Sequence, residues 1–352
     1  MFDLISDNVL VALIGGGGGI VLGLAARLGR FCTLGAIEDY LYGGSDARLR
    51  MWGVAIGVSI CGSFFASQLG YFGLSEASYL SQSLNIGASV IGGLMFGYGM
   101  ALAGNCGYGA LARLGGGDLR SLVIVLVMGL SALFVLSGPL GYANLAIFPH
   151  SADPLAVPGL AHGIHDMTGI PVSAVGLAIG LVIIILSIAT RSKGVIKPAL
   201  LWGGIVGFAI VSGWVGTDFV ARNGFDATPI VSHTFSAPIG ASMLYAMTAS
   251  GTAITFGVGS VIGLLFGSFI GSLIKGHFKW EACEDPRELR RQIVGAALMG
   301  AGAVIAFGCS VGQGLSAMSV LAYSAPITLA AIFVGASFGL KQLIEGFQPV
   351  VD

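Results

Sequence analysis

Three cysteines stand in one repeated glycine frame, and their spacing predicts a set of thiols with a shared role. Cys32, Cys106 and Cys309 each follow a glycine by nine positions and precede another by three, in the pattern G-x8-C-x2-G. A thiol in a low-dielectric site stays neutral, because burial raises its pKa. Neutral S–H groups are weak, polarisable donors, which suits a soft, sulfur-rich anion that must be released again after binding. We therefore interpret these three residues as substrate-binding groups.

The other two cysteines lack this frame and have simpler interpretations. Cys61, in Ser-Ile-Cys-Gly-Ser, is expected to be a small core residue, because free cysteine is among the most buried residue types. Cys283 lies in the charged segment Trp-Glu-Ala-Cys-Glu-Asp and is expected to face solvent. The five cysteines form no CxxC pair and no zinc-type spacing, so we expect neither a disulfide framework nor a metal site. No cofactor is expected, and the chain has no G-x4-G-K-[ST] loop for a nucleotide.

Small and polar residues near the cysteines are the further site candidates. Asn105 and Gln313 flank cysteines, where they would orient a substrate or satisfy freed backbone carbonyls. His233 lies in Ser-His-Thr-Phe-Ser-Ala-Pro, a fourth slot without a cysteine, and both a site role and a structural hydrogen bond stay open for it. The candidates that join the cysteines in substrate binding are Asn105, Gly107, Gly109, Gly312, Gln313, His233 and Ser236.

Four charged or imidazole side chains are less specific candidates. Glu38 and Asp39 follow Cys32 and either face an inner vestibule or, as we expect, solvate a short interfacial helix. His162 and His165 have i, i+3 spacing, but we place them in an outer loop and interpret them as loop residues.

The composition is that of an integral membrane protein. Hydrophobic residues make up 55% of the chain and charged residues 9%, whereas soluble domains average about 25% charged residues. Glycine accounts for 58 of the 352 residues, and small residues let helices approach closely in a bilayer. The net charge of −1 and the absence of a basic tract exclude a nucleic-acid partner. Asp3 and Asp7 stand where a signal peptide would be basic, so we expect a first span rather than a cleavable signal.

Nine segments are predicted to be transmembrane helices, since a helix needs about 20 apolar residues to cross a bilayer. They are residues 8–28, 50–70, 86–103, 119–139, 172–189, 199–216, 252–275, 292–308 and 327–344. With the N-terminus outside and the C-terminus inside, 15 of the 16 Lys and Arg residues lie on the inner side and only Arg222 lies outside. The predicted fold class is an all-α polytopic membrane protein. These nine ranges contain no carboxylate, which favours facilitated movement over ion coupling.

An internal repeat connects the cysteine frame to a transporter architecture. Residues 97–109 align with residues 300–312 at a constant offset of 203, and spans one to four resemble spans six to nine. A shift of five spans is odd, so the two halves would insert in opposite orientations. We predict a first half-repeat at residues 1–150, a connector with the fifth span at 151–197, and an inverted second half-repeat at 198–352. The short third and eighth spans end in glycine- and cysteine-containing loops, which predicts re-entrant breaks along a central path.

Four segments resemble the YeeE/YedE family of membrane proteins. They are Gly-Arg-Phe-Cys32-Thr-Leu-Gly-Ala, Gly-Tyr-Gly-Met-Ala-Leu-Ala-Gly-Asn-Cys106-Gly-Tyr-Gly, Ser-His233-Thr-Phe-Ser-Ala-Pro and Gly-Cys309-Ser-Val-Gly-Gln-Gly-Leu-Ser. The resemblance implies a bacterial inner-membrane protein that imports thiosulfate past three pore-lining cysteines, with Cys106 as the central one. It also implies a TusA-like sulfur-carrier protein at the cytoplasmic face, acting as a separate chain. Related proteins handle other sulfur compounds and selenium, so these substrates stay open.

Other functions remain as alternatives to thiosulfate import. A transporter of selenium or another sulfur species is the nearest alternative. A soft-metal transporter would use Cys, Met and His, but no CxxC or MxxM run supports it. A membrane thiol-redox protein would need a resolving cysteine, and none is adjacent in sequence. We therefore expect a transporter and not an enzyme.

Overall fold

The computed structural model describes residues 6–82, 84–149, 159–189, 193–282 and 285–346, and in these ranges the elements of secondary structure are helices joined by loops. The first half contains α1 (Asp7–Leu28), α2 (Thr33–Leu41), α3 (Ala47–Gln68), the 3-10 turn η1 (Leu74–Glu76), α4 (Ile86–Ala103), α5 (Gly107–Gly115), α6 (Leu119–Leu136) and α7 (Pro139–Ile147). The remainder contains α8 (Leu160–Thr168), α9 (Val172–Ile188), α10 (Lys193–Asn223), α11 (Ser236–Thr248), α12 (Phe256–Ile274), α13 (Pro286–Ile305), the π-turn η2 (Gly312–Ala317) and α14 (Ser324–Glu345). The predicted all-α polytopic fold class is confirmed.

Seven helical segments in the described part of the chain are long and apolar enough to cross a membrane. The helix pair α8 and α9, bent by 120°, raises this number to eight if it forms one span. The two predicted spans that fall short alone are α9, with 17 residues, and α13, whose first turns carry Arg287, Glu288, Arg290 and Arg291. The count of nine spans therefore stays a prediction.

Two buried carboxylates lie in these helices just beyond the predicted span ranges, which themselves contain none. The helix α10 continues past residue 216 and includes Asp218, whose side chain is buried and pairs with Arg222 at 2.7 Å, one helical turn away. Asp7 is buried at the start of α1 and accepts hydrogen bonds from the backbone N–H groups of Phe225 and Asp226 at 2.6 and 2.8 Å. The sequence ranges missed both because the helices extend beyond the apolar runs that defined them.

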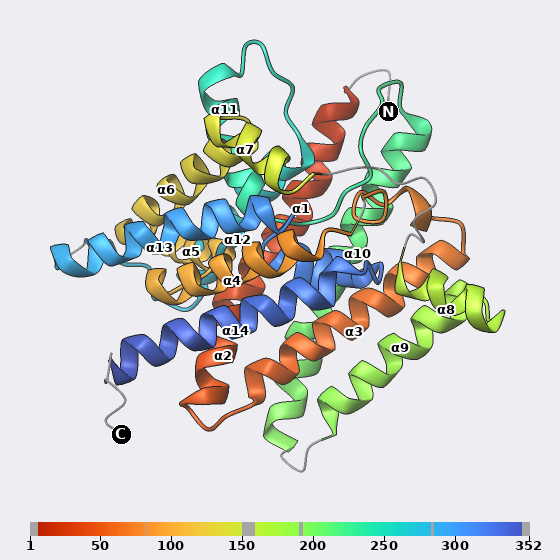
Figure 1. Cartoon of the computed structure of the whole chain (residues 1–352), viewed down its shortest axis with the longest axis horizontal. Helices are drawn as coiled ribbons and strands as arrows, with labels where there is room; N and C mark the ends of the chain where they lie inside the picture. The colour runs from red at the N-terminus through yellow and green to blue at the C-terminus, as the bar shows by residue number, and fades with distance from the viewer. Residues whose placement is uncertain (1–5, 83, 150–158, 190–192, 283–284, 347–352) are drawn as a thin grey trace.

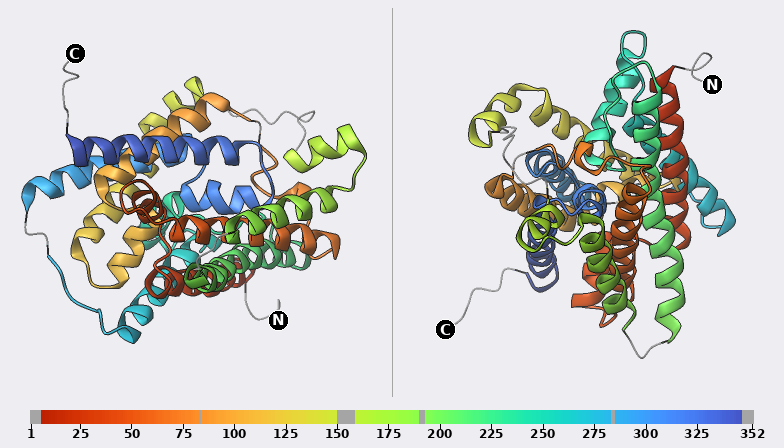
Figure 2. Two further views of the ribbon diagram at one scale, coloured as in Figure 1. Left: turned by 90° about the horizontal axis from the view of Figure 1, so that it is seen from below. Right: turned by 90° about the vertical axis from the view of Figure 1, so that its right-hand side faces the viewer.

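The long helices pair in an arrangement that crosses between the two halves of the chain. Contacts join α1 to α12, α3 to α10, α4 to both α13 and α14, and α6 to α13. In Figure 1, α4 lies beside α13 and α14, and the right-hand view of Figure 2 shows α1 and α10 side by side. If α1, α3, α4 and α6 correspond to α10, α12, α13 and α14, the contact of α1 with α12 recurs as that of α10 with α3. The contact of α4 with α14 recurs in the same way as that of α13 with α6.

Glycines set the separation of α1 and α12, the pair that flanks the site. A Cβ atom at Gly19 would collide with the carbonyl oxygen of Ser260, and one at Gly263 would collide with that of Gly16. The same holds at Gly23, where a Cβ would meet the Leu264 carbonyl. Small residues thus let two backbones touch, which is the packing expected of helices in a bilayer.

Candidate substrate-binding site

Each of the three framed cysteines follows the same backbone turn. A long helix ends, the residue two positions before the cysteine takes a positive φ, and a short helix begins directly after the cysteine. The φ angles are 55° at Arg30, 74° at Gly104 and 59° at Phe307. Positive φ costs little at glycine but is strained at arginine and phenylalanine, and such strain is concentrated at functional sites. The chain therefore forms one turn three times, although only one of the three has glycine at the strained position.

Cys106 lies at the centre of the site and is completely buried. Its sulfur accepts a hydrogen bond from the backbone N–H of Gly109 at 3.4 Å, which caps the start of α5. The hydroxyl of Thr33 stands 3.9 Å from the same sulfur, and the hydroxyl of Ser310 is a further hydrogen-bonding neighbour. Segments from three separate parts of the chain thus meet at this thiol.

Cys32 is half-buried, and its thiol is a spatial neighbour of the Cys106 thiol. Gly109 separates the two: a Cβ built on it would stand 3.7 Å from the Cys106 sulfur and 3.8 Å from the Cys32 sulfur. The lack of an adjacent cysteine in the sequence therefore does not argue against redox chemistry. Two thiols 74 positions apart in sequence are neighbours in space.

Cys309 occupies the matching position in the second half and is also buried. Its sulfur accepts a hydrogen bond from the N–H of Gly312 at 3.4 Å and lies 3.6 Å from the hydroxyl of Thr234. The hydroxyl of Tyr79 lies near that of Thr234 and stands 2.8 Å from where a Cβ of Gly312 would be. The next residue, Ser310, accepts a 3.0 Å hydrogen bond from Thr33.

These contacts join thiols and hydroxyls into one continuous series across the two halves. In order, the series contains Thr234, Cys309, Ser310, Thr33, Cys106 and Cys32. The helices α2 and α5 and the helical segment 310–319 each begin directly after a framed cysteine, and α11 begins two residues after Thr234. The backbone N–H groups of Gly109 and Gly312 donate to the sulfurs of Cys106 and Cys309. Helix N-termini carry partial positive charge and favour anions.

Among the polar candidates, Gln313 has a structural role, whereas Asn105 and Ser236 each keep a buried polar atom without a partner in the described residues. Gln313 donates from Nε2 to the carbonyl oxygens of Ala306 and Phe307 at 2.9 and 3.2 Å, so it satisfies freed carbonyls, one of its two expected roles. Asn105 is buried next to Cys106, and its Oδ1 has no hydrogen-bond partner in the described residues. Ser236 begins α11, and its buried hydroxyl is also without a partner in that part of the chain.

The imidazole of His233 lies between α1 and α12. Its Nδ1 and the Ser260 hydroxyl are 2.7 Å apart, its ring packs on Phe256, and it occupies the space left by Gly18. The backbone carbonyl of His233 accepts a 2.6 Å hydrogen bond from Ser316. Nδ1 therefore makes a structural hydrogen bond, whereas Nε2 is buried without a partner among the described residues, so both interpretations of His233 stay open.

Two of the glycine candidates, Gly107 and Gly312, lie where neighbouring side chains come close to the backbone. A Cβ at Gly107 would stand 2.6 Å from the terminal methyl of Met128 and 3.7 Å from the Ser236 hydroxyl. A Cβ at Gly312 would stand 2.6 Å from the Thr234 hydroxyl. Side chains at these two positions would push into the groups that surround the thiols.

A cavity of about 300 Å³ opens at the Cys32 end of the series, and we call it the basic cavity. It lies among the ends of α1, α5 and α12, and Cys32, Asn105 and Gly109 form part of its wall. Its charged lining is strongly positive and consists of Arg27, Arg30, Arg48, Arg113 and Lys275, with Glu38 as the acidic member. Glu38 thus faces a vestibule instead of only solvating a helix, and Asp39 pairs with Arg48 at 3.1 Å.

A second opening, the Thr234 groove, lies at the other end of the series. It has a volume of about 310 Å³ and lies against the starts of α1, α11 and α12, with Asn8, Ser232, Thr234 and Thr255 as its polar lining. The helix α1 has 22 residues, so its two ends are roughly 30 Å apart at 1.5 Å per residue. Cys32 and Thr234, the two ends of the series, therefore line two openings at opposite ends of α1 and α12.

Several groups of this site were not predicted from the sequence. Thr33 and Ser310 each directly follow a framed cysteine, so a Cys-Ser/Thr pattern was a usable signal. Thr234 is next to His233, and its role became visible only in the structure. The arginines of the basic cavity were assigned to inner loops, because charge counting along the chain does not show that distant loops surround one cavity.

The remaining sequence candidates lie apart from the thiols or outside the described residues. Cys61 packs between α3 and α9, with its sulfur 3.8 Å from the Leu177 carbonyl oxygen. Cys283 lies outside the described residues. His165 makes a 2.7 Å contact with the carbonyl of Ile170 at the end of α8, and His162 lies on the same helix. Within the described ranges, no group of three or more His, Cys, Asp and Glu side chains is arranged to hold a metal.

Comparisons with known proteins identify the family of this chain. The profile of the family described as Sulphur transport matches residues 28–338. Among curated proteins, the chain is 25% identical over 353 aligned positions to the thiosulfate transporter TsuA of Escherichia coli (strain K12), covering 95% of this chain and 93% of that protein. It is also 25% identical over 323 positions to the thiosulfate transporter TsuA of Spirochaeta thermophila, covering 90% of this chain and 93% of the relative. The family resemblance noted in the sequence is thereby confirmed.

Proposed function

Because this chain belongs to the Sulphur transport family, we propose that it imports thiosulfate through the series of thiols and hydroxyls centred on Cys106. The chain is a multi-pass membrane transporter and not an enzyme. Both TsuA relatives are named thiosulfate transporters, which supports thiosulfate as the substrate here.

The observation that carries the proposal is the continuity of the polar series from the Thr234 groove to the basic cavity. The contacts run from the 3.6 Å pair of Thr234 and Cys309, through the 3.0 Å hydrogen bond of Thr33 with Ser310, to Cys106, which lies 3.9 Å from Thr33 and beside Cys32. An anion leaving one group therefore meets the next donor before it loses the previous one. This replaces the water that thiosulfate gives up when it enters the membrane.

The helix N-termini and the thiols would contribute to anion binding in different ways. The partial charges of the helix N-termini hold the dianion without a full positive charge, so the ion is attracted but not trapped. The S–H groups are soft, weak donors that suit the terminal sulfur of thiosulfate, while the hydroxyls of Thr33 and Ser310 suit its oxygens. Selectivity for sulfur-containing anions would then come from the cysteines.

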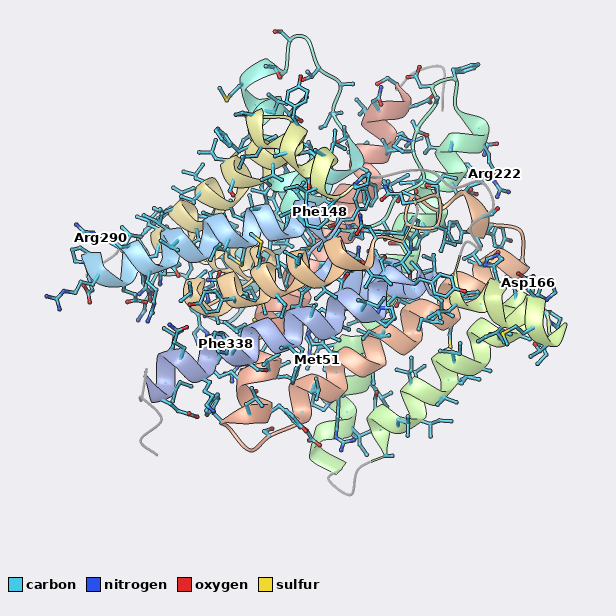
Figure 3. The ribbon with its side chains drawn as sticks, in the orientation of Figure 1. Met51, Phe148, Asp166, Arg222, Arg290 and Phe338 are labelled. Carbon is cyan, nitrogen blue, oxygen red and sulfur yellow. The ribbon has the colours of Figure 1, made fainter. Side chains whose placement is uncertain are left out.

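The direction of import follows from the proposed topology. With the N-terminus in the periplasm and the C-terminus in the cytoplasm of a bacterial inner membrane, the Thr234 groove faces outward and the basic cavity faces inward. In Figure 3, Arg290 lies at the opposite side of the molecule from Arg222 and Asp166, as inner and outer ends would. A separate TusA-like sulfur carrier would receive the ion below the basic cavity.

Uptake of labelled thiosulfate into proteoliposomes tests the proposal. We expect Cys106→Ala to abolish uptake and Cys32→Ala and Cys309→Ala to reduce it severely, whereas Cys61→Ala should behave as wild type. Competition by unlabelled thiosulfate, sulfite or a selenium analogue measures the substrate preference directly. Equal uptake by all four variants would reduce the cysteines to packing residues, and stronger competition by the selenium compound would favour the alternative substrate.

A further inference from the structure

Two arginines of the basic cavity have no side-chain partner among the residues that the structure describes. Arg48 is engaged by Asp39 at 3.1 Å, and Lys275 donates to two backbone carbonyls at the end of α1 at 2.9 and 3.0 Å. By contrast, Arg30 and Arg113 form neither a hydrogen bond nor an ion pair from their side chains within the described residues. Both line the cavity, so their guanidinium donors are available to a ligand there.

The basic side chains of this cavity outnumber Glu38, its acidic member, so the lining carries an excess of positive charge. Burial, together with the charges of Arg30 and Arg27, lowers the pKa of Lys275 below its ordinary value. The charge of Arg113 also acts on Arg27 from across the cavity. Like charges repel, and the repulsion is stronger where water is partly excluded. Arg30 is moreover held in a strained backbone conformation, with a φ of 55°.

A buried polar group without a partner faces the same space. Asn105 is 1% exposed, contributes to the cavity wall and leaves its Oδ1 unpaired within the described chain. Rotation of the amide by 180° would turn its NH₂ group toward a ligand, since the two amide orientations differ little in shape. The preference of basic residues for the cytoplasmic side explains which face they occupy. It does not explain why they surround a cavity that contains an unpaired buried amide.

We propose that the basic cavity is a second anion site, which binds a divalent oxyanion such as sulfate or hydrogen phosphate independently of the thiols. Guanidinium groups recognise the oxygen atoms of such ions through paired, charge-assisted hydrogen bonds. These bonds do not require a sulfur atom on the ligand, so the cavity is less selective than the cysteine series. A sulfate ion bound there blocks the exit of thiosulfate past Cys32 and slows import, a consequence that rests on the proposed function.

Binding of radiolabelled sulfate to the purified full-length protein in a neutral detergent tests the site without transport. Wild type and Cys106→Ala should bind sulfate alike. The double variant Arg30→Gln/Arg113→Gln should bind at least roughly a hundredfold more weakly, since it loses two charge-assisted interactions and each is expected to contribute a factor of about ten or more. Arg290→Gln is the matched control, because Arg290 is an exposed arginine of α13 that does not line the cavity. Thermal unfolding verifies that each variant is folded.

Three outcomes would overturn the second site. The first is unchanged sulfate binding in the double variant, and the second is loss of sulfate binding in Cys106→Ala, which would place sulfate among the thiols. The third is displacement of sulfate in nanodiscs of phosphatidylglycerol but not of phosphatidylcholine, which would assign the cavity to a lipid headgroup. None of these measurements requires thiosulfate transport, so they stand even if the proposed function fails.

The regulatory consequence is measured separately in proteoliposomes of known orientation. Sulfate sealed on the side of the basic cavity should slow thiosulfate uptake by wild type and by Arg290→Gln, but not by the double variant. Uptake that is insensitive to this sulfate in wild type, despite measurable binding, would refute the inhibition. Absence of any uptake by wild type would instead count against the proposed function.

Discussion

The hydroxyl of Thr33 donates a 3.0 Å hydrogen bond to the hydroxyl of Ser310, across 277 positions of sequence. The two residues follow Cys32 and Cys309, so this bond joins the starts of two short helices that belong to opposite halves of the chain. Cys106, on a third helix start, lies 3.9 Å from the same Thr33 oxygen. The site therefore depends on a hydroxyl that connects all three cysteine turns.

Removing this hydroxyl should impair transport more than it impairs folding. Thr33→Val keeps the shape of the side chain but loses the contacts with Ser310 and Cys106. Since one hydrogen bond contributes about 1 kcal/mol, we expect uptake to fall roughly fivefold or more. Thr33→Ser, which retains the hydroxyl, should keep most activity. If the valine variant transports as well as wild type, Thr33 is not part of the path.

The central sulfur should not be replaceable by oxygen. In Cys106→Ser the donor is harder, and C–O is about 0.4 Å shorter than C–S, in a site where sub-ångström placement matters. The small change in volume should leave folding almost intact, with a cost below about 1.5 kcal/mol. We expect most labelled thiosulfate uptake to be lost while the variant inserts and unfolds like wild type. Full activity in the serine variant would show that a hydroxyl is sufficient and that sulfur is not required.

Oxidation should inactivate the transporter by linking two of its thiols. Cys32 and Cys106 are neighbours, so a mild oxidant such as diamide, which accepts two electrons and two protons, should convert them into a disulfide. Uptake should stop, return after treatment with a thiol reductant, and correlate with a linked peptide detected by mass spectrometry. Cys309→Ala should still form the link and Cys32→Ala should not. If uptake instead required the disulfide to form during turnover, the result would favour a thiol-redox protein.

Much of the fold could be predicted from the sequence because it depends on local signals. The third predicted span, residues 86–103, coincides with α4, since an apolar run bounded by Asn85 and Gly104 defines both ends. The repeated glycine frame likewise predicted the grouping of the cysteines. The end of α10 could not be predicted from hydropathy, because the pair of Asp218 and Arg222 lets the helix continue past the apolar run. The basic cavity depends on contacts among α1, α5 and α12, which no local pattern encodes.

Tyr79 should contribute to binding at the outer end of the series. Its hydroxyl lies near Thr234 and Cys309. Burial, followed by the nearby Cys309, raises the pKa of Tyr79, so the hydroxyl remains a protonated donor at neutral pH. Tyr79→Phe removes one donor to the anion, and we expect KM for thiosulfate to rise roughly fivefold with little change in the maximal rate. Tyr71→Phe is the control, because Tyr71 is a 64% exposed tyrosine of the same connecting segment. An equal effect of both substitutions would attribute the loss to the segment and not to the hydroxyl.

A single methyl group at Gly109 should separate transport from stability. The Cβ of Gly109→Ala would lie 3.7 Å from the Cys106 sulfur and 3.8 Å from the Cys32 sulfur, which are ordinary van der Waals distances. The fold therefore accommodates the methyl group without strain, and alanine in place of a helical glycine stabilises a protein by up to about 1 kcal/mol. The same methyl group occupies the space through which an anion would contact both thiols.

We therefore expect Gly109→Ala to unfold at the same temperature as wild type or slightly higher, while its thiosulfate uptake falls to near that of Cys106→Ala. The matched control is Gly17→Ala in α1, because a Cβ at Gly17 meets no atom within 4 Å and the position is remote from the thiols. That variant should keep full uptake with a similar gain in stability. If Gly109→Ala transports normally, the anion does not pass between Cys32 and Cys106, and the order of the proposed series is wrong at that step.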